Sequence, residues 1–189
     1  MDQSLATIYE HMKDFGLYLL AKGVVDATFS AFENPYSSAV SVPICSQAAE
    51  ILIKARIAQE HPLLIFSKLP RLSTTDDRNM ELQDLFEHGR TLMYSELPDL
   101  LWAATGYRMS NLERYNSYGS LRNCIVHFSV PERDLSEETY RFAFEVMQPM
   151  LNDFWQENIL EYIPDFDQPV EYVEEALDRL NITYQQPSA

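Results

Sequence analysis

The sequence predicts an all-α protein, and three observations carry that prediction. Glycine is scarce, with 5 in 189 residues, whereas a turn-rich β fold would use more of it. Hydrophobic residues make up 46% of the chain, which is enough for a core. In several long segments the apolar residues recur at spacings of three and four, the period of an amphipathic helix. We therefore expect an up-and-down helical bundle with additional short helices and no sheet.

Two long helices are predicted in the N-terminal part. The first covers about Asp2 to Glu33, and the sequence ENPYSS with Pro35 breaks it. A second should begin near Val42 or Pro43, because proline is acceptable in a first helical turn, and it should end at Pro62. The inward face expected for the first helix is Leu5, Ile8, Met12, Phe15 and Leu19. The corresponding face of the second is Ala48, Ile51, Leu52, Ala55 and Ala58.

The middle of the chain predicts one ion pair, one loop and two short helices. Glu50 and Lys54 are four residues apart, so we expect them to pair on the outside of their helix. The polar segment from Ser67 to Asn79 is typical of an exposed loop. Short helices should follow over MELQDLFEHG and over about residues 97–104.

The C-terminal part predicts two further long helices and a short one. Residues Ser110 to Phe128 form the first, with Ser110 as N-cap and Glu113 completing a capping box. The second runs from Ser136 to about Tyr162, and Pro149 should kink it or sit at a break. We assign residues 1–165 to a single α-helical domain, and 166–189 to a short helix and a flexible tail.

Composition limits the functions that the chain can have. A net charge of −15 argues against broad, charge-driven binding to nucleic acid, although a small basic site can exist on an acidic body. No apolar stretch reaches the ~20 residues of a membrane span, and the N-terminus has no signal-peptide pattern, so we expect a cytoplasmic protein without membrane contact. Cys45 and Cys124 lack metal-ligand spacing and are expected to be buried free thiols. We expect no metal and no cofactor.

The segment SLRNCIVHFSV places three polar side chains in an apolar run. The predicted helix seam there is Tyr118, Leu121, Ile125 and Phe128. Asn123 and His127 are four residues apart and share a helix face, and Arg122 lies beside it. A buried charge is costly unless it is paired or used, so Arg122 needs an explanation.

These residue types suit cleavage of RNA without a metal ion. Arginine grips a phosphate with a planar fork of donors, and histidine transfers protons near neutral pH. A base that deprotonates a 2′-hydroxyl and a cation that stabilises the phosphate would promote attack on the adjacent phosphate. Arg114 could extend a phosphate track, or be part of a solvated face. Tyr118 could stack on a base, or pack in the core.

The sequence Arg122-Asn123-Cys124-Ile125-Val126-His127 resembles the motif of HEPN domains, in which Arg and a polar residue precede three others and His. These are compact α-helical domains, many of them RNases of toxin–antitoxin, phage-defence and CRISPR systems. The segment SQAAEILIKARIAQEHPLLIF is similar to their other characteristic helix. The resemblance covers about residues 42–156.

The resemblance implies an endoribonuclease of prokaryotic toxin, phage-defence or stress response. It implies a homodimer whose two motifs share one cleft, metal-independent cleavage to a 2′,3′-cyclic phosphate, and an antitoxin or defence-system partner. Arg122 would hold the scissile phosphate, His127 would act as general acid or base, and Asn123 would order the two. The chain departs from the family at Ser129, where some toxins carry a tyrosine that their partner modifies, so that form of control is not implied.

Two other hypotheses stay open from the sequence. The first is a catalytically inactive HEPN module for binding or assembly. The second is an unrelated helical interaction domain in which Arg122 pairs with a carboxylate such as Glu113 or Asp134. The position of His127 separates them from the nuclease, because a histidine packed under other helices would exclude catalysis.

Overall fold

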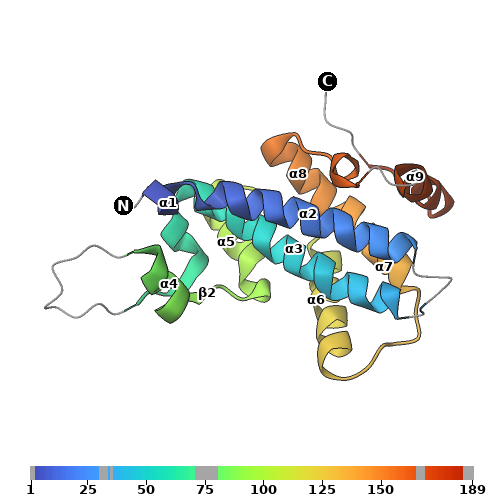
Figure 1. The fold of residues 1–189 in the computed structure, drawn as a ribbon, viewed down its shortest axis with the longest axis horizontal. Helices are drawn as coiled ribbons and strands as arrows, with labels where there is room; N and C mark the ends of the chain where they lie inside the picture. The colour runs from blue at the N-terminus through green and yellow to red at the C-terminus, as the bar shows by residue number, and fades with distance from the viewer. Residues whose placement is uncertain (1–2, 30–33, 35, 71–80, 165–168, 185–189) are drawn as a thin grey trace, which may run out of the picture. The chain divides into compact units, whose positions relative to one another are not determined.

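A computed structural model describes residues 3–29, 34, 36–70, 81–164 and 169–184. The described chain is mostly helical, which confirms the all-α class (Figure 1). It divides into two compact units, unit 1 with residues 1–14 and 50–108, and unit 2 with residues 15–49 and 109–189. No helix in the described ranges is both long enough and apolar enough to cross a membrane. The expected boundary between residues 165 and 166 lies outside the described residues.

Unit 1 combines helical segments with one pair of short strands. Its core includes Leu52, Ile53, Ile57, Leu97 and Leu101, all with no exposed surface. In chain order it contains α1 (Gln3–Ala6), the start of α2 (Ile8–Thr28), the end of α3 (Ser37–Glu60), η1 (Pro62–Ile65), β1 (Phe66–Lys68), α4 (Leu82–His88), β2 (Arg90–Thr91), η2 (Tyr94–Glu96) and α5 (Leu97–Thr105).

The strand pair contradicts the expectation that the chain has no sheet. β1 and β2 pair antiparallel, with Phe66 opposite Thr91. Strands of three and two residues are too short to show an alternating pattern in the sequence, which is why the pattern gave no sign of them. Most of the predicted Ser67–Asn79 loop lies outside the described residues.

The predicted pair of Glu50 and Lys54 is confirmed, but it is not on the outside. Lys54 Nζ lies 2.6 Å from Glu50 Oε1 and donates a second hydrogen bond of 3.1 Å to Thr91 Oγ1. Lys54 is only 6% exposed. The buried ammonium depends on these partners, because water cannot replace them. The pair therefore ties α3 to β2.

Unit 2 contains the helices that carry the candidate site. Within it, α2 and α3 run side by side (Figure 1). The remaining elements are α6 (Leu112–His127), α7 (Leu135–Phe142), the π-helical turn η3 (Ala143–Met147), α8 (Gln148–Trp155), η4 (Ile159–Tyr162) and α9 (Pro169–Arg179).

One predicted proline position is wrong and the other is confirmed: Pro43 lies inside a helix rather than at its start, whereas Pro149 lies at a break, in the first turn of α8. α3 begins at Ser37, so Pro43 is in its interior. Pro149 has no N–H to bond to the carbonyl four residues earlier, and the π-helical turn ends two residues before it. In that turn the Gln148 N–H bonds to the Ala143 carbonyl. The predicted helix to Tyr162 ends instead at Trp155, where Gln156 takes a left-handed φ of 56°.

The buried face of α2 differs from the predicted one. Phe15 is 53% exposed, and the core side chains are instead Leu17, Leu20, Ala21, Val24 and Ala27. Gly23 lies on this face because α3 approaches closely there. A Cβ at Gly23 would overlap Cys45 Sγ and come within 3.3 Å of Ile44 Cγ2. Because α2 and α3 approach closely, α2 buries the face that carries its small residues. The predicted face, which carries larger apolar residues such as Phe15, is left outside.

Replacing one partner of the buried ion pair should have unequal effects. Glu50→Gln leaves a buried ammonium with neutral acceptors only, and we expect a loss of about 2–4 kcal/mol in unfolding free energy. Lys54→Met leaves a carboxylate whose side chain is 21% exposed and reaches water, and should cost only about 1 kcal/mol. Urea unfolding measures both. Equal losses would contradict the burial of Lys54.

The effect of Gly23→Ala on the unfolding free energy should change sign when Cys45 is replaced. Gly23→Ala should destabilise the protein by about 1–2 kcal/mol net, because overpacking outweighs the gain in helix propensity. In a Cys45→Ala background the sulfur is absent, and the same change should stabilise by about 0.5–1 kcal/mol. Urea unfolding of the four proteins completes the cycle. The same cost in both backgrounds would show that the sulfur does not limit the approach.

Candidate functional site

The candidate site lies on α6. The N-cap of this helix is one residue away from the predicted one. Asn111, rather than Ser110, is the N-cap, and its side chain accepts a hydrogen bond of 3.2 Å from the Arg114 N–H. An amide and a hydroxyl cap helices equally well, so two adjacent candidates could not be separated from the sequence.

Tyr118 anchors the middle of α6 in the core of unit 2. Its ring stacks on Phe142, with centroids 3.9 Å apart and planes 4° from parallel. Its hydroxyl lies 3.1 Å from Thr139 Oγ1 and also hydrogen-bonds to the Cys45 thiol. Tyr118 is 2% exposed, so the expectation that it stacks on a substrate base is wrong for this conformation. It is a core residue that fixes α6 against α7 and α3.

Cys45 confirms the expectation of a buried free thiol. It has no exposed surface, and burial raises the pKa of its thiol to about 12. The hydrogen bond from Tyr118 opposes this shift only in part. A thiol in this state is a packing group and not a nucleophile.

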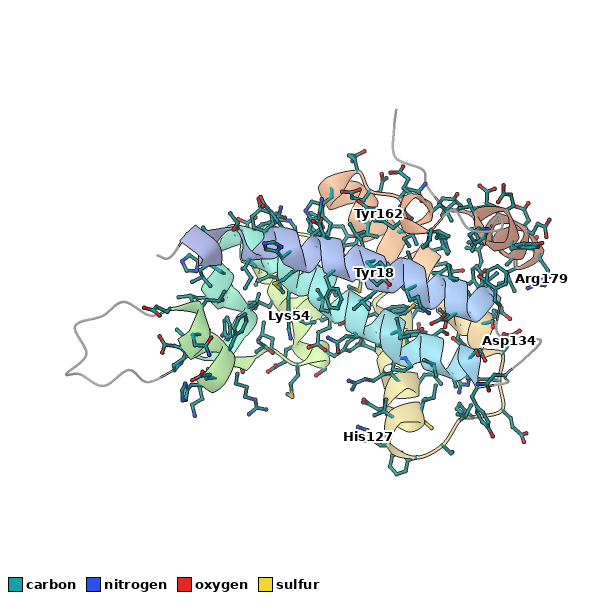
Figure 2. The ribbon with its side chains drawn as sticks, in the orientation of Figure 1. Tyr18, Lys54, His127, Asp134, Tyr162 and Arg179 are labelled. Carbon is teal, nitrogen blue, oxygen red and sulfur yellow. The ribbon has the colours of Figure 1, made fainter. Side chains whose placement is uncertain are left out.

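The C-terminal turn of α6 leaves the core. The predicted seam holds at Leu121, which is 5% exposed, and fails at Phe128, which is 87% exposed. Cys124 was expected to be buried and is half-buried, with its thiol donating to the Ser129 carbonyl at 3.5 Å. Figure 2 shows His127 at the end of the helix. Asn123 and His127 are therefore open to solvent, whereas Arg122 is half-buried.

Arg122, Asn123 and His127 all lie in the C-terminal half of α6, with Arg122 half-buried and the other two exposed. Arg122 Nη1 donates a hydrogen bond of 3.0 Å to Asn123 Oδ1, so the amide orients the guanidinium. Asn123 and His127 are both exposed and lie one helical turn apart. Because His127 is not packed under other helices, its position is compatible with catalysis.

Arg122 stands apart from the carboxylates of the described residues, although the protein is very acidic. Within the described residues no carboxylate lies within ion-pair distance of it. Of the proposed partners, Asp134 instead accepts a hydrogen bond of 2.9 Å from the Glu137 N–H as the N-cap of α7. Among the other described lysines and arginines of unit 2, only Arg179 also has no carboxylate within ion-pair distance. The others pair with carboxylates: Lys22, Arg114, Arg133 and Arg141.

Arg114 does not extend a phosphate track. Its Nε lies 2.9 Å from Glu145 Oε2, and its Nη1 lies 3.7 Å from Glu138 Oε2. Arg141 joins the same cluster, with its Nη1 2.8 Å from Glu145 Oε1. These carboxylates cancel the charge of Arg114 and would repel a phosphate. The sequence places Arg114 on the side of Arg122, but it does not show which acids α7 and η3 bring to it.

The exposure of Phe128 is the feature that sequence reasoning missed. Its spacing continues the seam, so periodicity alone places it inside. The available signal was its position at the helix end, three residues before Pro131. Val126 and Val130, at 49% and 40% exposure, are the other apolar side chains beside the motif.

Comparisons of the chain with models of protein families, with curated proteins and with solved structures found no match. In the part of the chain that the structure describes, no three or more His, Cys, Asp and Glu side chains are grouped so that they could hold a metal ion.

The two ends of α6 should differ in what they contribute to stability. His127→Ala and Phe128→Ala should each change the unfolding free energy by less than about 0.5 kcal/mol, because both side chains are exposed. Tyr118→Ala should cost about 3–5 kcal/mol, because it removes a buried ring and its hydrogen bonds. Urea unfolding compares the three. A large loss for His127→Ala would mean that the end of α6 is buried in the folded protein.

Proposed function

We propose that the protein is a HEPN-type endoribonuclease that cleaves RNA without a metal ion. Cleavage would proceed by attack of a 2′-hydroxyl on the adjacent phosphate and leave a 2′,3′-cyclic phosphate. The resemblance of the α6 motif to that of HEPN domains gives the reaction class. One observation supports it more than any other: Arg122, which has no ion-pair partner among the described residues and is hydrogen-bonded to Asn123, lies on the same helix as the exposed His127, five residues before it.

Each of the three side chains has a role in this reaction. The guanidinium of Arg122 is always charged and would bind the scissile phosphate and stabilise the charge that develops on it. Asn123 holds the guanidinium through its 3.0 Å hydrogen bond. His127 would transfer a proton to or from the reacting oxygens. Asn123 and His127 are exposed, and Arg122 is half-buried.

A second copy of the chain would complete the site. The reaction needs a base for the 2′-hydroxyl and an acid for the leaving 5′-oxygen. One motif contributes a single imidazole, so two motifs that face each other would supply both groups. We therefore propose a homodimer with a composite active site. An antitoxin or another protein of a defence system is the regulator that the resemblance suggests.

A catalytically silent binding module is the second candidate function. The exposed apolar side chains of Val126 and Val130 favour it, since such groups beside a motif can form a contact surface. It requires folding and association without cleavage.

Cleavage of a mixed cellular RNA pool in EDTA tests the proposal. His127→Ala should lose at least ~100-fold in rate, the contribution of a general acid or base. Arg122→Lys should lose activity as well, because it keeps the charge but not the planar fork. Products should carry a 2′,3′-cyclic phosphate end, which end-group analysis detects.

His88→Ala is the matched control, because His88 is also an exposed histidine that ends a helix. It should cleave like the wild type. Equal rates for His127→Ala and His88→Ala would refute the role of His127. Folded, dimeric protein without any cleavage would favour the binding module.

A further inference from the structure

Two cations lie directly opposite each other on the strand pair of unit 1. Lys68 of β1 and Arg90 of β2 are register partners, and both residues are exposed. Opposite residues of an antiparallel pair project to the same face of the sheet, with Cα atoms within about 5.5 Å, and like charges in this arrangement destabilise the sheet. The fold therefore accepts an electrostatic cost at this point.

An irregularity in the strand pairing creates this arrangement. Phe66 lies opposite Thr91, so regular pairing would place Ser67 opposite Arg90. A register shift between Phe66 and Lys68 inserts Ser67 as an extra residue, and Lys68 takes the position opposite Arg90 instead. Bulges of this kind redirect a side chain. The Ser67 hydroxyl stabilises the bulge, because it donates a hydrogen bond of 3.0 Å to the Arg90 carbonyl.

Contacts on both sides of Arg90 fix the strand that carries it. Gly89, directly before it, lies so close to β1 that an added Cβ would be 2.8 Å from Cε1 of Phe66. Thr91, directly after it, accepts the 3.1 Å hydrogen bond from the buried Lys54. The backbone positions from which the two cations project are thus fixed by unit 1 itself.

No carboxylate of the described residues lies within ion-pair distance of Lys68 or Arg90. Arg90 Nη2 donates to Met93 Sδ at 3.9 Å, and a thioether is a weak, uncharged acceptor. The nearest acids in the sequence have other partners. Glu87 accepts from an amide of its own helix, and Glu96 accepts from the Met93 N–H at 2.7 Å. The two charges are therefore available to an anion from solution.

We propose that Lys68 and Arg90 bind the terminal phosphate of a phosphate monoester. Arginine offers a planar fork of donors that matches two phosphate oxygens, and lysine adds a compact charge. A monoester phosphate carries close to two negative charges at neutral pH, which two cations match, whereas each phosphate of a nucleic-acid backbone carries one. This site lies in unit 1 and is independent of the proposed function, which rests on α6 of unit 2.

Titration of the ¹⁵N-labelled protein with methyl phosphate, followed by amide chemical shifts at constant ionic strength, tests the site. The signals of residues 66–68 and 90–91 should shift and saturate. Lys68→Gln and Arg90→Gln should each weaken binding about 3- to 10-fold, the loss of one charge-assisted contact at an exposed site. Arg108→Gln is the matched control and should bind normally. Arg108 is an exposed cation of the same unit, and its guanidinium lies 4.4 Å from the centre of the Trp102 ring.

Equal affinities of the wild type and both strand variants would overturn the proposal, as would shifts that increase without saturation. Dimethyl phosphate, which carries a single charge, should bind more weakly than methyl phosphate. Equal binding of the two would refute the assignment to a monoester.

A 5′-phosphorylated dinucleotide distinguishes two sources of the phosphate group. Tighter binding than that of methyl phosphate, lost when the 5′-phosphate is removed, would assign the site to the end of a nucleic acid. Binding equal to that of methyl phosphate would assign it to a small phosphorylated molecule. Binding that persists without the 5′-phosphate would contradict the proposal.

A double-mutant cycle of unfolding, built from Lys68→Gln and Arg90→Gln, gives a second readout without any ligand. Because the two charges repel each other, the coupling between them should be unfavourable at low salt. It should disappear at 1 M salt, where charges are screened over about 3 Å. A coupling of zero or of favourable sign at low salt would show that the two cations do not face each other, and the proposal would fail.

Discussion

The stack of Tyr118 on Phe142 is the contact on which the rest of the site depends. It holds the middle of α6 against the end of α7, and its hydroxyl is shared with Thr139 and the Cys45 thiol. That thiol can lie there only because Gly23 on α2 leaves room for it. Four helices are therefore fixed at one buried point. Because the fixed point is central, the last turn of α6 extends beyond the core and carries its polar side chains into solvent.

Periodicity was a good guide to helices and a poor guide to their buried faces. It predicted the inward alanines of α3, and the spacing of Glu50 and Lys54 predicted their pair. It failed for Phe15 and Phe128, which continue apolar stripes and yet are 53% and 87% exposed. Burial depends on where the neighbouring helix lies, and the spacing of apolar residues along one helix does not determine that position. Pro149 was placed correctly as an irregularity, but whether a chain kinks or forms a π-helical turn depends on packing.

The same distinction applies to the candidate site. Spacing along one helix was enough to place Arg122 next to Asn123, to which it donates a hydrogen bond, because a local period fixes local neighbours. Spacing could not show that Arg114 meets Glu138 and Glu145, since those acids come from other elements. Nor could it show that Tyr118 is a core residue, because an aromatic side chain suits both a core and a base. Local geometry was predictable, and partners from elsewhere in the chain were not.

An acidic body changes what a nucleic-acid site has to provide. Most such sites gain affinity from many phosphate contacts and so bind RNA of any sequence. Here the field of the whole protein opposes that, and at physiological salt it is screened over about 8 Å. The phosphate contact proposed for Arg122 would act within that distance, where the net charge matters least. If the proposed function holds, the net charge would weaken non-specific binding of RNA, so the target would have to be recognised by its shape or delivered by a partner.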